Sequence, residues 1–251
     1  MKVSIITATN NSEKTIEDCI KSLISQVYVN VEFIIIDNNS TDSTLAIIEK
    51  YQLKNKSIKL ISESDNGIYD ALNKGVSHAS GEIIGFLHSD DLYFDCYSIL
   101  DVVGFFNDNK YDGVYGDLQY VNKENTDKVI RLWKSRVYHS KLLKMGWMPA
   151  HPTLFLKKQV YQKHGEFQTS YKISADYDFT LRILKDTTLK FGYMPKCITK
   201  MRVGGASNRS IKNIIQKTRE DYKVVSSNNV GGWFSIVLKN ISKIKQFKLT
   251  L

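Results

Sequence analysis

The chain has 251 residues, of which 42% are hydrophobic and 24% are charged, with only 3 prolines and 14 glycines. This composition is that of a folded protein with one ordinary domain, or one domain with a short appendage, and it excludes collagen-like, low-complexity and largely disordered chains. The sequence shows neither a run of roughly 20 apolar residues, as a membrane-spanning helix needs, nor the apolar core of a signal peptide, so we expect a cytoplasmic protein.

The net charge of +9 is concentrated at one end of the chain. Residues 1–199 contain 24 basic and 24 acidic residues, whereas residues 200–251 contain 11 basic and 2 acidic ones. A basic excess confined to one end favours contact with a phosphate-rich surface, such as anionic lipid or the diphosphate of a ligand.

The first half of the chain alternates short apolar segments with segments of helical periodicity. The apolar segments are continuous, which is typical of strands in a parallel sheet that helices cover on both faces. Hydrophobic spacing and polar start signals predict the helices between them. The predicted strands are 3–6, 32–37, 58–61 and 81–87, and the predicted helices are 16–24, 43–51 and 68–79.

The second half is patterned less clearly. Strands are predicted at 112–120 and 153–156, and a helix is predicted at 177–184. Because regular alternation with helices is lost here, a mixed sheet is the better expectation. The sequence shows no repeat and no linker, so we expect one compact domain over residues 1–205 and a basic helical tail over 206–251.

Polar residues follow each of the first four predicted strands, at 7–11, 37–42, 63–66 and 88–91. The carboxyl ends of parallel strands meet at one edge of a sheet, where open α/β sheets bind their ligands. Any one cluster is also typical of turns and helix caps, but four clusters at one edge favour a binding site.

The chemistry of these clusters favours a nucleotide bound together with a metal ion. An acid that ends a strand, as Asp37 does, commonly accepts hydrogen bonds from a ribose or a base, and the adjacent Asp90 and Asp91 could hold a divalent cation that bridges two phosphates. Neither GxGxxG nor GxxxxGK followed by Ser or Thr is present, which disfavours dinucleotide oxidoreductases and P-loop NTPases. Arg202 would add positive charge near the diphosphate.

Five segments carry a resemblance when they are taken together and in order: VSIITATNN at 3–11, IDNNSTD at 36–42, DNGIYDALNKG at 65–75, GEIIGFLHSDD at 81–91 and ADYDF at 175–179. They resemble the family 2 glycosyltransferases of the GT-A fold, cytosolic bacterial enzymes that build surface polysaccharides from nucleotide sugars. The resemblance covers residues 3–205. It implies a three-layer, Rossmann-like α/β fold with a mostly parallel, mixed central sheet, followed here by the C-terminal helical tail.

The resemblance implies a donor site built from these segments. Thr9 and Asp37 would contact the nucleobase and the ribose, and Asp90 would be the metal ligand of the family's DxD position, with Asp91 beside it. The implied metal is Mn²⁺ or Mg²⁺. The implied nucleotide-sugar contacts are Thr9, Asp37, Asp65, Asn73, Ser89, Asp90 and Arg202, and the implied metal ligands are Asp90 and Asp91.

Three positions depart from the family pattern. His88 replaces the first acid of DxD, where a neutral imidazole could donate or accept one hydrogen bond. Leu72 stands where many members have Arg, which removes one expected cationic contact to the donor. Ala175 precedes the expected base where Glu is usual.

By the same resemblance, Asp176 is the general base that takes a proton from the acceptor hydroxyl. Asp178 is the alternative, and helical spacing points residues two apart about 200° away from each other, so only one of the pair can face the site. His151 and Trp147 would lie on the acceptor side, and the glycines at 204–205 would mark a loop that closes over the diphosphate.

The implied activity is an inverting, metal-dependent glycosyl transfer, in which the metal and the basic loop stabilise the departing diphosphate. A UDP-sugar is the expected donor, and a saccharide on a lipid diphosphate carrier is the expected acceptor. Two alternatives stay open. A sugar-nucleotide nucleotidyltransferase needs a glycine-rich basic loop after the first strand, which residues 7–11 do not provide. A basic nucleic-acid-binding module is disfavoured by the neutral body of the chain.

The end of the tail is amphipathic on a helical wheel, with Lys239, Lys243 and Lys245 outside the apolar arc or at its margins and Lys248 breaking the pattern. A basic amphipathic helix with Trp and Phe is typical of a peripheral anchor at the inner face of the cytoplasmic membrane. Packing of the same face on the domain, or on a second copy in a homo-oligomer, is equally open. The apolar residues are Trp233, Phe234, Ile236, Val237, Leu238, Ile241, Ile244 and Phe247.

Overall fold

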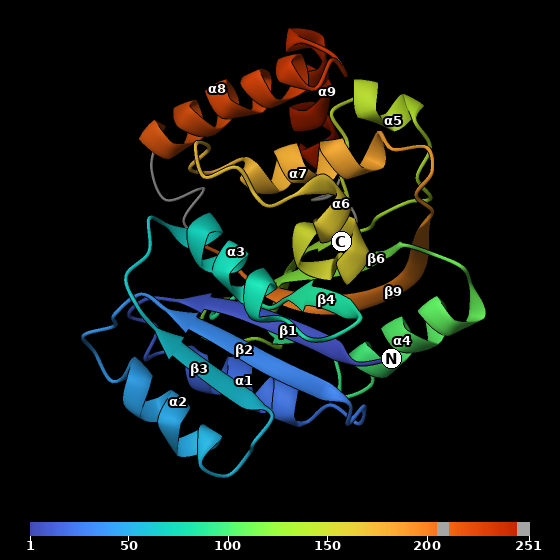
Figure 1. Ribbon diagram of the computed structural model, residues 1–251. Coiled ribbons are helices and arrows are strands. Elements are labelled where there is room, and N and C mark those ends of the chain that lie inside the picture. The colour runs from blue at the N-terminus through green and yellow to red at the C-terminus, as the bar shows by residue number, and fades with distance from the viewer. Residues whose placement is uncertain (205–210, 245–251) are drawn as a thin grey trace.

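A mixed β-sheet forms the centre of the computed structural model, which describes residues 1–204 and 211–244 (Figure 1). Within those residues the strand order is β3-β2-β1-β4-β8-β6-β9-β5, and β7 pairs with β6 beside this path. The strands are β1 (Val3–Thr9), β2 (Val31–Asp37), β3 (Ile58–Ser62), β4 (Ile83–Phe86), β5 (Leu92–Tyr93), β6 (Gly113–Val121), β7 (Val129–Trp133), β8 (Phe155–Lys157) and β9 (Phe191–Arg202).

Helices cover both faces of this sheet, so the fold has three layers (Figure 1). One hydrophobic core lies between the sheet and α1, α2 and α4, and the other lies between the sheet and α3, α6, α7, α8 and α9. The expected α/β fold is confirmed. The helices are α1 (Ile16–Ile24), α2 (Thr44–Gln52), α3 (Ile68–His78), α4 (Ser98–Asp108), α5 (Lys141–Lys144), α6 (Lys158–His164), α7 (Ala175–Leu184), α8 (Ile211–Ser227) and α9 (Trp233–Ile244), with a 3₁₀ turn η1 (His151–Thr153).

The parallel half of the sheet follows the sequence prediction. Strand β1 runs parallel to β2 and β4, and β2 runs parallel to β3. Thr9 lies opposite Asp37, and Asp37 lies opposite Ser62, so these strands end level with one another. Helix α3 packs closely on β1, because Gly75 leaves room that a Cβ atom would take from the Ile6 side chain. The polar loops therefore emerge at one edge.

The second half is mixed, as expected, but several of its elements were not predicted, among them the long strand β9 and the helix α4. Strand β8 is antiparallel to β4 and β6, while β9 is parallel to β6. Strand β9 is hidden in the sequence because Pro195 interrupts its apolar pattern, and its pairing with β6 shifts register between Tyr193 and Cys197. Helices α4, α5 and α6 and strands β5 and β7 were also not predicted, and the strand predicted at 153–156 is in fact the end of η1 followed by β8.

Helices α8 and α9 pack on the domain. Val224, Val225 and Val230 belong to the same core cluster as residues of β1, α3 and α7, and so does Ile236. The boundary at residue 205 stays a prediction, but the described part of the tail shares the core of the domain. Among the described helices, none combines the length and hydrophobicity that crossing a bilayer requires.

The apolar arc predicted for the tail is divided in the structure. Ile236 faces the core, and Lys239, expected outside the arc, is buried beside it at 6% exposure. Trp233 and Phe234 are exposed instead, although Trp233 stacks on Tyr222 with ring centroids 4.6 Å apart. The expectations for Gly205, Lys245, Phe247 and Lys248 lie outside the described residues, and so do those for the side chains of Lys243 and Ile244.

One buried carboxylate joins the parallel strands at the edge opposite the polar loops. Glu32 at the start of β2 accepts hydrogen bonds from Ser4 Oγ, from the Ser80 backbone N–H and from Lys59 Nζ, the last at 2.8 Å, and it pairs with Lys2 at 3.0 Å. Burial alone would raise the pKa of Glu32, but the hydrogen bonds from Lys59, Ser4 and Ser80 outweigh it and hold the pKa well below its ordinary value.

We predict that Glu32→Gln lowers the free energy of unfolding at pH 7 by about 1–3 kcal/mol, because it leaves buried donors unpaired. A lowered folded-state pKa stabilises the fold above the unfolded pKa of about 4.3 and loses that effect as pH falls towards the folded value. The difference between the two proteins in urea unfolding should therefore shrink below about pH 4. Exposed Glu82→Gln is the control, expected within about 0.5 kcal/mol of wild type. A pH-independent difference would contradict this account.

Candidate active site

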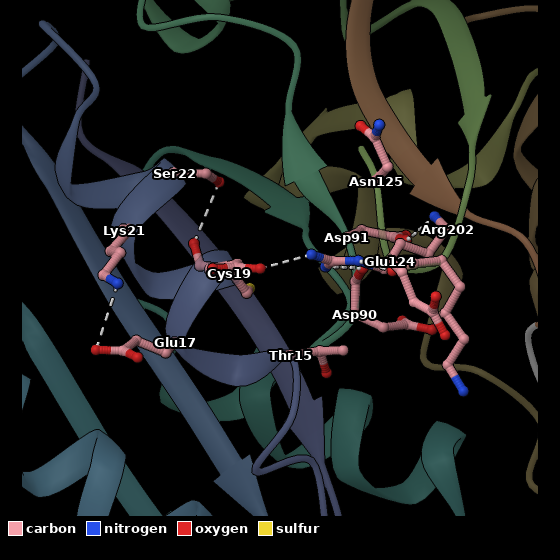
Figure 2. A network of polar contacts seen from close by, with 12 residues as sticks. Thr15, Glu17, Cys19, Lys21, Ser22, Asp90, Asp91, Glu124, Asn125 and Arg202 are labelled. Atoms are coloured by element: carbon pink, nitrogen blue, oxygen red, sulfur yellow. Dashed lines mark hydrogen bonds and ion pairs between the residues drawn. The ribbon is translucent and has the colours of Figure 1, made fainter. Parts of the chain in front are cut away.

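The loop that follows β4 carries Asp90 and is held by Arg202 at the end of β9 (Figure 2). The Arg202 guanidinium donates to the carbonyl oxygens of Asp90 at 2.7 Å and Lys123 at 3.0 Å, and to Asp18 Oδ2 at 2.6 Å. Arg202 is only 4% exposed. All three guanidinium nitrogens thus have internal partners, so Arg202 shapes the Asp90 loop from inside, and a direct contact with a diphosphate would require this buried side chain to become accessible.

The two adjacent carboxylates of this loop differ in accessibility. Asp91 is fully buried, and its Oδ1 accepts the backbone N–H of Arg202 at 3.2 Å, while its Oδ2 has no partner among the described residues. Burial, together with the charge of Asp90, raises the pKa of Asp91 well above its ordinary value. Asp90 is half-buried, so it is the carboxylate of the two that a ligand from solvent can reach.

The residues present suit a cation that is bound mainly through a nucleotide. Within residues 1–204 and 211–244, no group of three or more His, Cys, Asp and Glu side chains could hold a metal ion by itself. A cation here would have the Asp90 carboxylate as its protein ligand and phosphate oxygens and water as the others, which is how Mg²⁺ binds at many nucleotide sites. The accessible Asp90 and the unpartnered oxygen of Asp91 behind it fit that arrangement.

Three segments bring two histidines and one carboxylate together. His88 follows β4, His151 begins η1, and Asp176 lies in the first turn of α7. The rings of His88 and His151 are 6.2 Å apart between centroids. Burial lowers the pKa of His88 and lowers that of His151 to about 4, although the charge of Asp176 opposes both shifts and Asp90 opposes the shift of His88. Both imidazoles are therefore neutral at pH 7.

His151 is an unusual buried group. It is 8% exposed and stacks on Phe86 at 5.3 Å between ring centroids, yet neither ring nitrogen has a hydrogen-bond partner among the described residues. Leaving a buried polar group unpaired is costly and is typical of sites with a functional role. Trp147, the other predicted acceptor-side residue, lies in a different aromatic group with Tyr138 and Tyr115.

The structure separates the two candidate bases. Asp176 Oδ1 lies 3.1 Å from the Tyr69 hydroxyl and accepts the backbone N–H of Tyr177 at 2.8 Å. Asp178 is 2% exposed. It pairs with Arg182 at 2.9 Å and accepts a hydrogen bond at 2.9 Å from Asn228, which lies in the turn after α8. Asp178 thus serves the packing of α7, and Asp176 is the carboxylate of the two whose charge acts on the two histidines.

Two of the predicted donor contacts are engaged within the protein. Asp37 accepts the Ser40 backbone N–H at 2.9 Å and the Ser62 hydroxyl at 2.7 Å, which shapes the loop after β2. Asn73 of α3 is hydrogen-bonded in both directions to the backbone of Phe167, at 2.9 Å each. A donor contact from either side chain would compete with these partners.

The other predicted donor residues have freer surroundings. Thr9 is buried, and its hydroxyl has no partner among the described residues. Ser89 Oγ lies 3.0 Å from Ser12 Oγ. Asp65 is half-buried, caps the Gly67 backbone N–H at 2.8 Å and has its pKa raised by burial. These residues follow or end β1, β4 and β3, so the structure brings their segments to one edge of the sheet, although their binding roles stay predictions.

Sequence reasoning missed two residues that organise this site. Tyr69, which contacts Asp176, lies inside the DNGIYDALNKG segment, so its place in a recognised motif was a signal. Asp18 neutralises Arg202 from α1, and nothing in the sequence marks it apart from other acids in a first helical turn.

Comparison with known proteins agrees with this arrangement. Residues 4–164 match the sequence profile of glycosyl transferase family 2. An uncharacterized glycosyltransferase from Haemophilus influenzae is 26% identical, over 98% of this chain and 79% of its own length.

Two solved structures show the same fold. Staphylococcus aureus TarS 1–349 in complex with UDP-GlcNAc has a TM-score of 0.71 at 22% identity, over 92% of this chain and 66% of that one. The mannosyltransferase PcManGT from Pyrobaculum calidifontis, in complex with GDP-Man and Mn²⁺, has a TM-score of 0.67 at 18% identity, over 90% and 63%. This chain thus spans slightly less than two thirds of each. The chain belongs to glycosyl transferase family 2 and is a glycosyltransferase.

Proposed function

We propose that the protein catalyses the inverting, metal-dependent transfer of a sugar from a UDP-sugar to a hydroxyl group of a saccharide acceptor, in bacterial polysaccharide synthesis of the O-antigen or capsule type. The observation that carries the proposal is the carboxylate of Asp176, which is held by Tyr69 and whose charge acts on the neutral imidazoles of His88 and His151. Family membership favours this reading over a nucleotidyltransferase or a nucleic-acid-binding module.

The donor side of the proposal rests on Asp90 and on similarity. A similar structure contains UDP-GlcNAc, which makes UDP the first nucleotide to test, and another contains GDP-Man with Mn²⁺, which makes GDP the second. Asp90 would hold Mn²⁺ or Mg²⁺, which would supply positive charge next to the diphosphate. Arg202 fixes the backbone of the Asp90 loop for this purpose.

The chemical step needs one base. Asp176 takes the proton of the acceptor hydroxyl as that oxygen attacks the anomeric carbon from the face opposite the nucleotide, and a single displacement inverts the configuration. The Tyr69 hydroxyl orients the Asp176 carboxylate. Because His88 and His151 are neutral, they can hydrogen-bond to sugar hydroxyls without neutralising the charge of the base.

The acceptor side of the proposal rests on the exposed face of α9. Trp233, Phe234, Val237 and Ile241 are 48–74% exposed and lie on one side of the helix. An apolar face with aromatic residues on a basic segment is typical of a helix that lies in a membrane interface. We therefore propose a cytoplasmic enzyme that is peripheral at the inner face of the membrane, where a lipid-linked saccharide would be its acceptor.

We predict that Asp90→Asn weakens UDP binding in the presence of Mn²⁺ by roughly 10- to 100-fold, because the cation loses its charged protein ligand. Calorimetric titration of UDP with and without Mn²⁺ checks this. Glu124→Gln removes an exposed acid of the segment between β6 and β7 and should leave binding unchanged. Unchanged Mn²⁺ dependence in Asp90→Asn would contradict the proposed metal ligand.

We predict that Asp176→Asn lowers sugar transfer by about 10²-fold or more, the usual contribution of a general base, while UDP binding stays within about twofold. The measurement is transfer from a UDP-sugar alongside calorimetric binding of UDP. Asp178→Asn is the matched control: it should lower thermal stability, since Asp178 pairs with Arg182, yet retain transfer where it folds. Loss of transfer in Asp178→Asn alone would reverse the assignment.

We predict that replacing Trp233, Phe234 and Val237 together by Ser releases the protein from sedimenting vesicles that contain anionic lipid, because apolar burial in the interface is lost. The three side chains are at least half exposed, so the fold should tolerate the change. Val137→Ser and Leu53→Ser, which change exposed apolar residues elsewhere, are the control. Vesicle binding that persists in the triple variant would contradict the membrane role of this face, and a dimer in ultracentrifugation that the triple variant abolishes would favour packing against a second copy.

A further inference from the structure

Three consecutive backbone N–H groups in front of α7 converge on one carboxylate of α8. Lys172 donates to Glu220 Oε1 at 3.1 Å, and Ile173 and Ser174 donate to Glu220 Oε2 at 2.8 and 3.0 Å. Glu220 is 8% exposed. Hydrogen bonds to a charged acceptor are about twice as strong as neutral ones, so this carboxylate fixes the backbone path directly before the helical turn that contains Asp176.

A second contact layer ties the same segment to α9. Asp221 accepts the Ser174 hydroxyl at 2.8 Å and pairs with Lys239 Nζ at 2.8 Å. The ammonium group of Lys239 also lies 3.3 Å from the ring centroid of Tyr177, the residue after Asp176. All three helices therefore meet at the start of α7, and Figure 1 shows α8 and α9 gathered on the α7 side of the sheet.

Helix α3 also contacts residues 172–176, through the hydroxyl group of Tyr69. The Tyr69 hydroxyl lies 2.6 Å from the Ile173 carbonyl oxygen and 3.1 Å from Asp176 Oδ1, and its single proton is shared between them. The peptide unit that Glu220 holds through the Ile173 N–H is thus adjacent to the carbonyl that orients Tyr69. A shift of residues 172–174 would move Tyr69 and Asp176 with it.

Stability alone does not explain why Glu220, Asp221 and Lys239 are buried at the start of α7. Burying charged groups carries a desolvation cost, and well-packed apolar residues often hold helices equally well or better. Helix α8 already packs through Val224 and Val225. Residues 200–251 contain two acidic residues, Glu220 and Asp221, and both turn inward to the segment before Asp176.

We propose that Glu220 is a positioning residue for sugar transfer, which holds the segment 172–174 so that Asp176 meets the acceptor hydroxyl, and that the Asp221–Lys239 pair anchors this arrangement to α9. Helices α8 and α9 are then part of the catalytic unit. This inference rests on the proposed function of Asp176 as the base.

The test is a double-mutant cycle in the full-length chain. Glu220→Gln places an amide NH₂ against backbone N–H groups, so we expect kcat for transfer to fall by about 10- to 100-fold, the scale of a misplacement of about 1 Å. The KM for the UDP-sugar and the affinity for UDP should stay within about twofold. In the Asp176→Asn background the same change should alter kcat by less than about threefold, because there is no longer a base to misplace.

Two further variants control for a general effect of changing α8 and for loss of folding. Lys223→Gln changes an exposed residue of the same helix and should leave kcat unchanged. Glu220→Asp keeps the charge but is one methylene shorter, so it should fold where Glu220→Gln does not and still lower kcat by about 10-fold. Circular dichroism and thermal melting establish which variants are folded.

The possible outcomes distinguish the positioning role of Glu220 from the role of Asp176 as the base. An unchanged kcat in folded Glu220→Gln and Glu220→Asp, or an equal loss in both the wild-type and Asp176→Asn backgrounds, would overturn the positioning role alone. Full transfer by Asp176→Asn would instead overturn the proposed base, and the role of Glu220 with it.

Discussion

The guanidinium of Arg202 is the interaction on which the site end of the fold depends. It lies at the last residue of β9 and joins α1 through Asp18, the Asp90 loop after β4, and the segment between β6 and β7 through Lys123. A buried guanidinium needs hydrogen-bond acceptors, and this arrangement of four segments supplies one for each of its nitrogens. The position of Asp90 is therefore set by a residue 112 positions away in the sequence.

Sequence reasoning succeeded where local pattern decides structure. The parallel strands are continuous apolar runs, and their ends carry polar residues, so the parallel sheet and the edge at which those residues gather could be predicted. It missed β9 because Pro195 breaks the pattern and the strand is defined by its pairing with β6. Burial does not alternate regularly along the residues of β9, so the strand has no period-2 hydrophobic pattern that would mark it in the sequence.

The candidate site could be predicted only in part for the same reason, because contacts between distant segments decide which aspartates are free to bind a ligand. Residue type and motif order indicated Asp90 and Asp176, but an aspartate that shapes a loop and one that faces a ligand look alike in sequence. Asp37 holds Ser40 and Ser62, and Asp178 holds Arg182, so both carboxylates have internal partners that only the folded chain reveals. The binding role of Asp37 rests on resemblance, whereas the separation of Asp176 from Asp178 rests on these contacts.

The positions of Glu220 and Asp221 show how the basic tail can both pack on the domain and keep a basic surface. With Glu220 and Asp221 turned inward and Lys239 buried against Asp221, the remaining basic residues described on α8 are left at or near the surface. Helix α9 is then attached to the domain by the Lys239–Asp221 ion pair, by Ile236 and by the stacking of Trp233 on Tyr222, while Phe234, Val237 and Ile241 stay exposed. One helix can therefore hold the base-bearing segment on its inner side and offer an apolar side to a membrane, because separate residues serve each side.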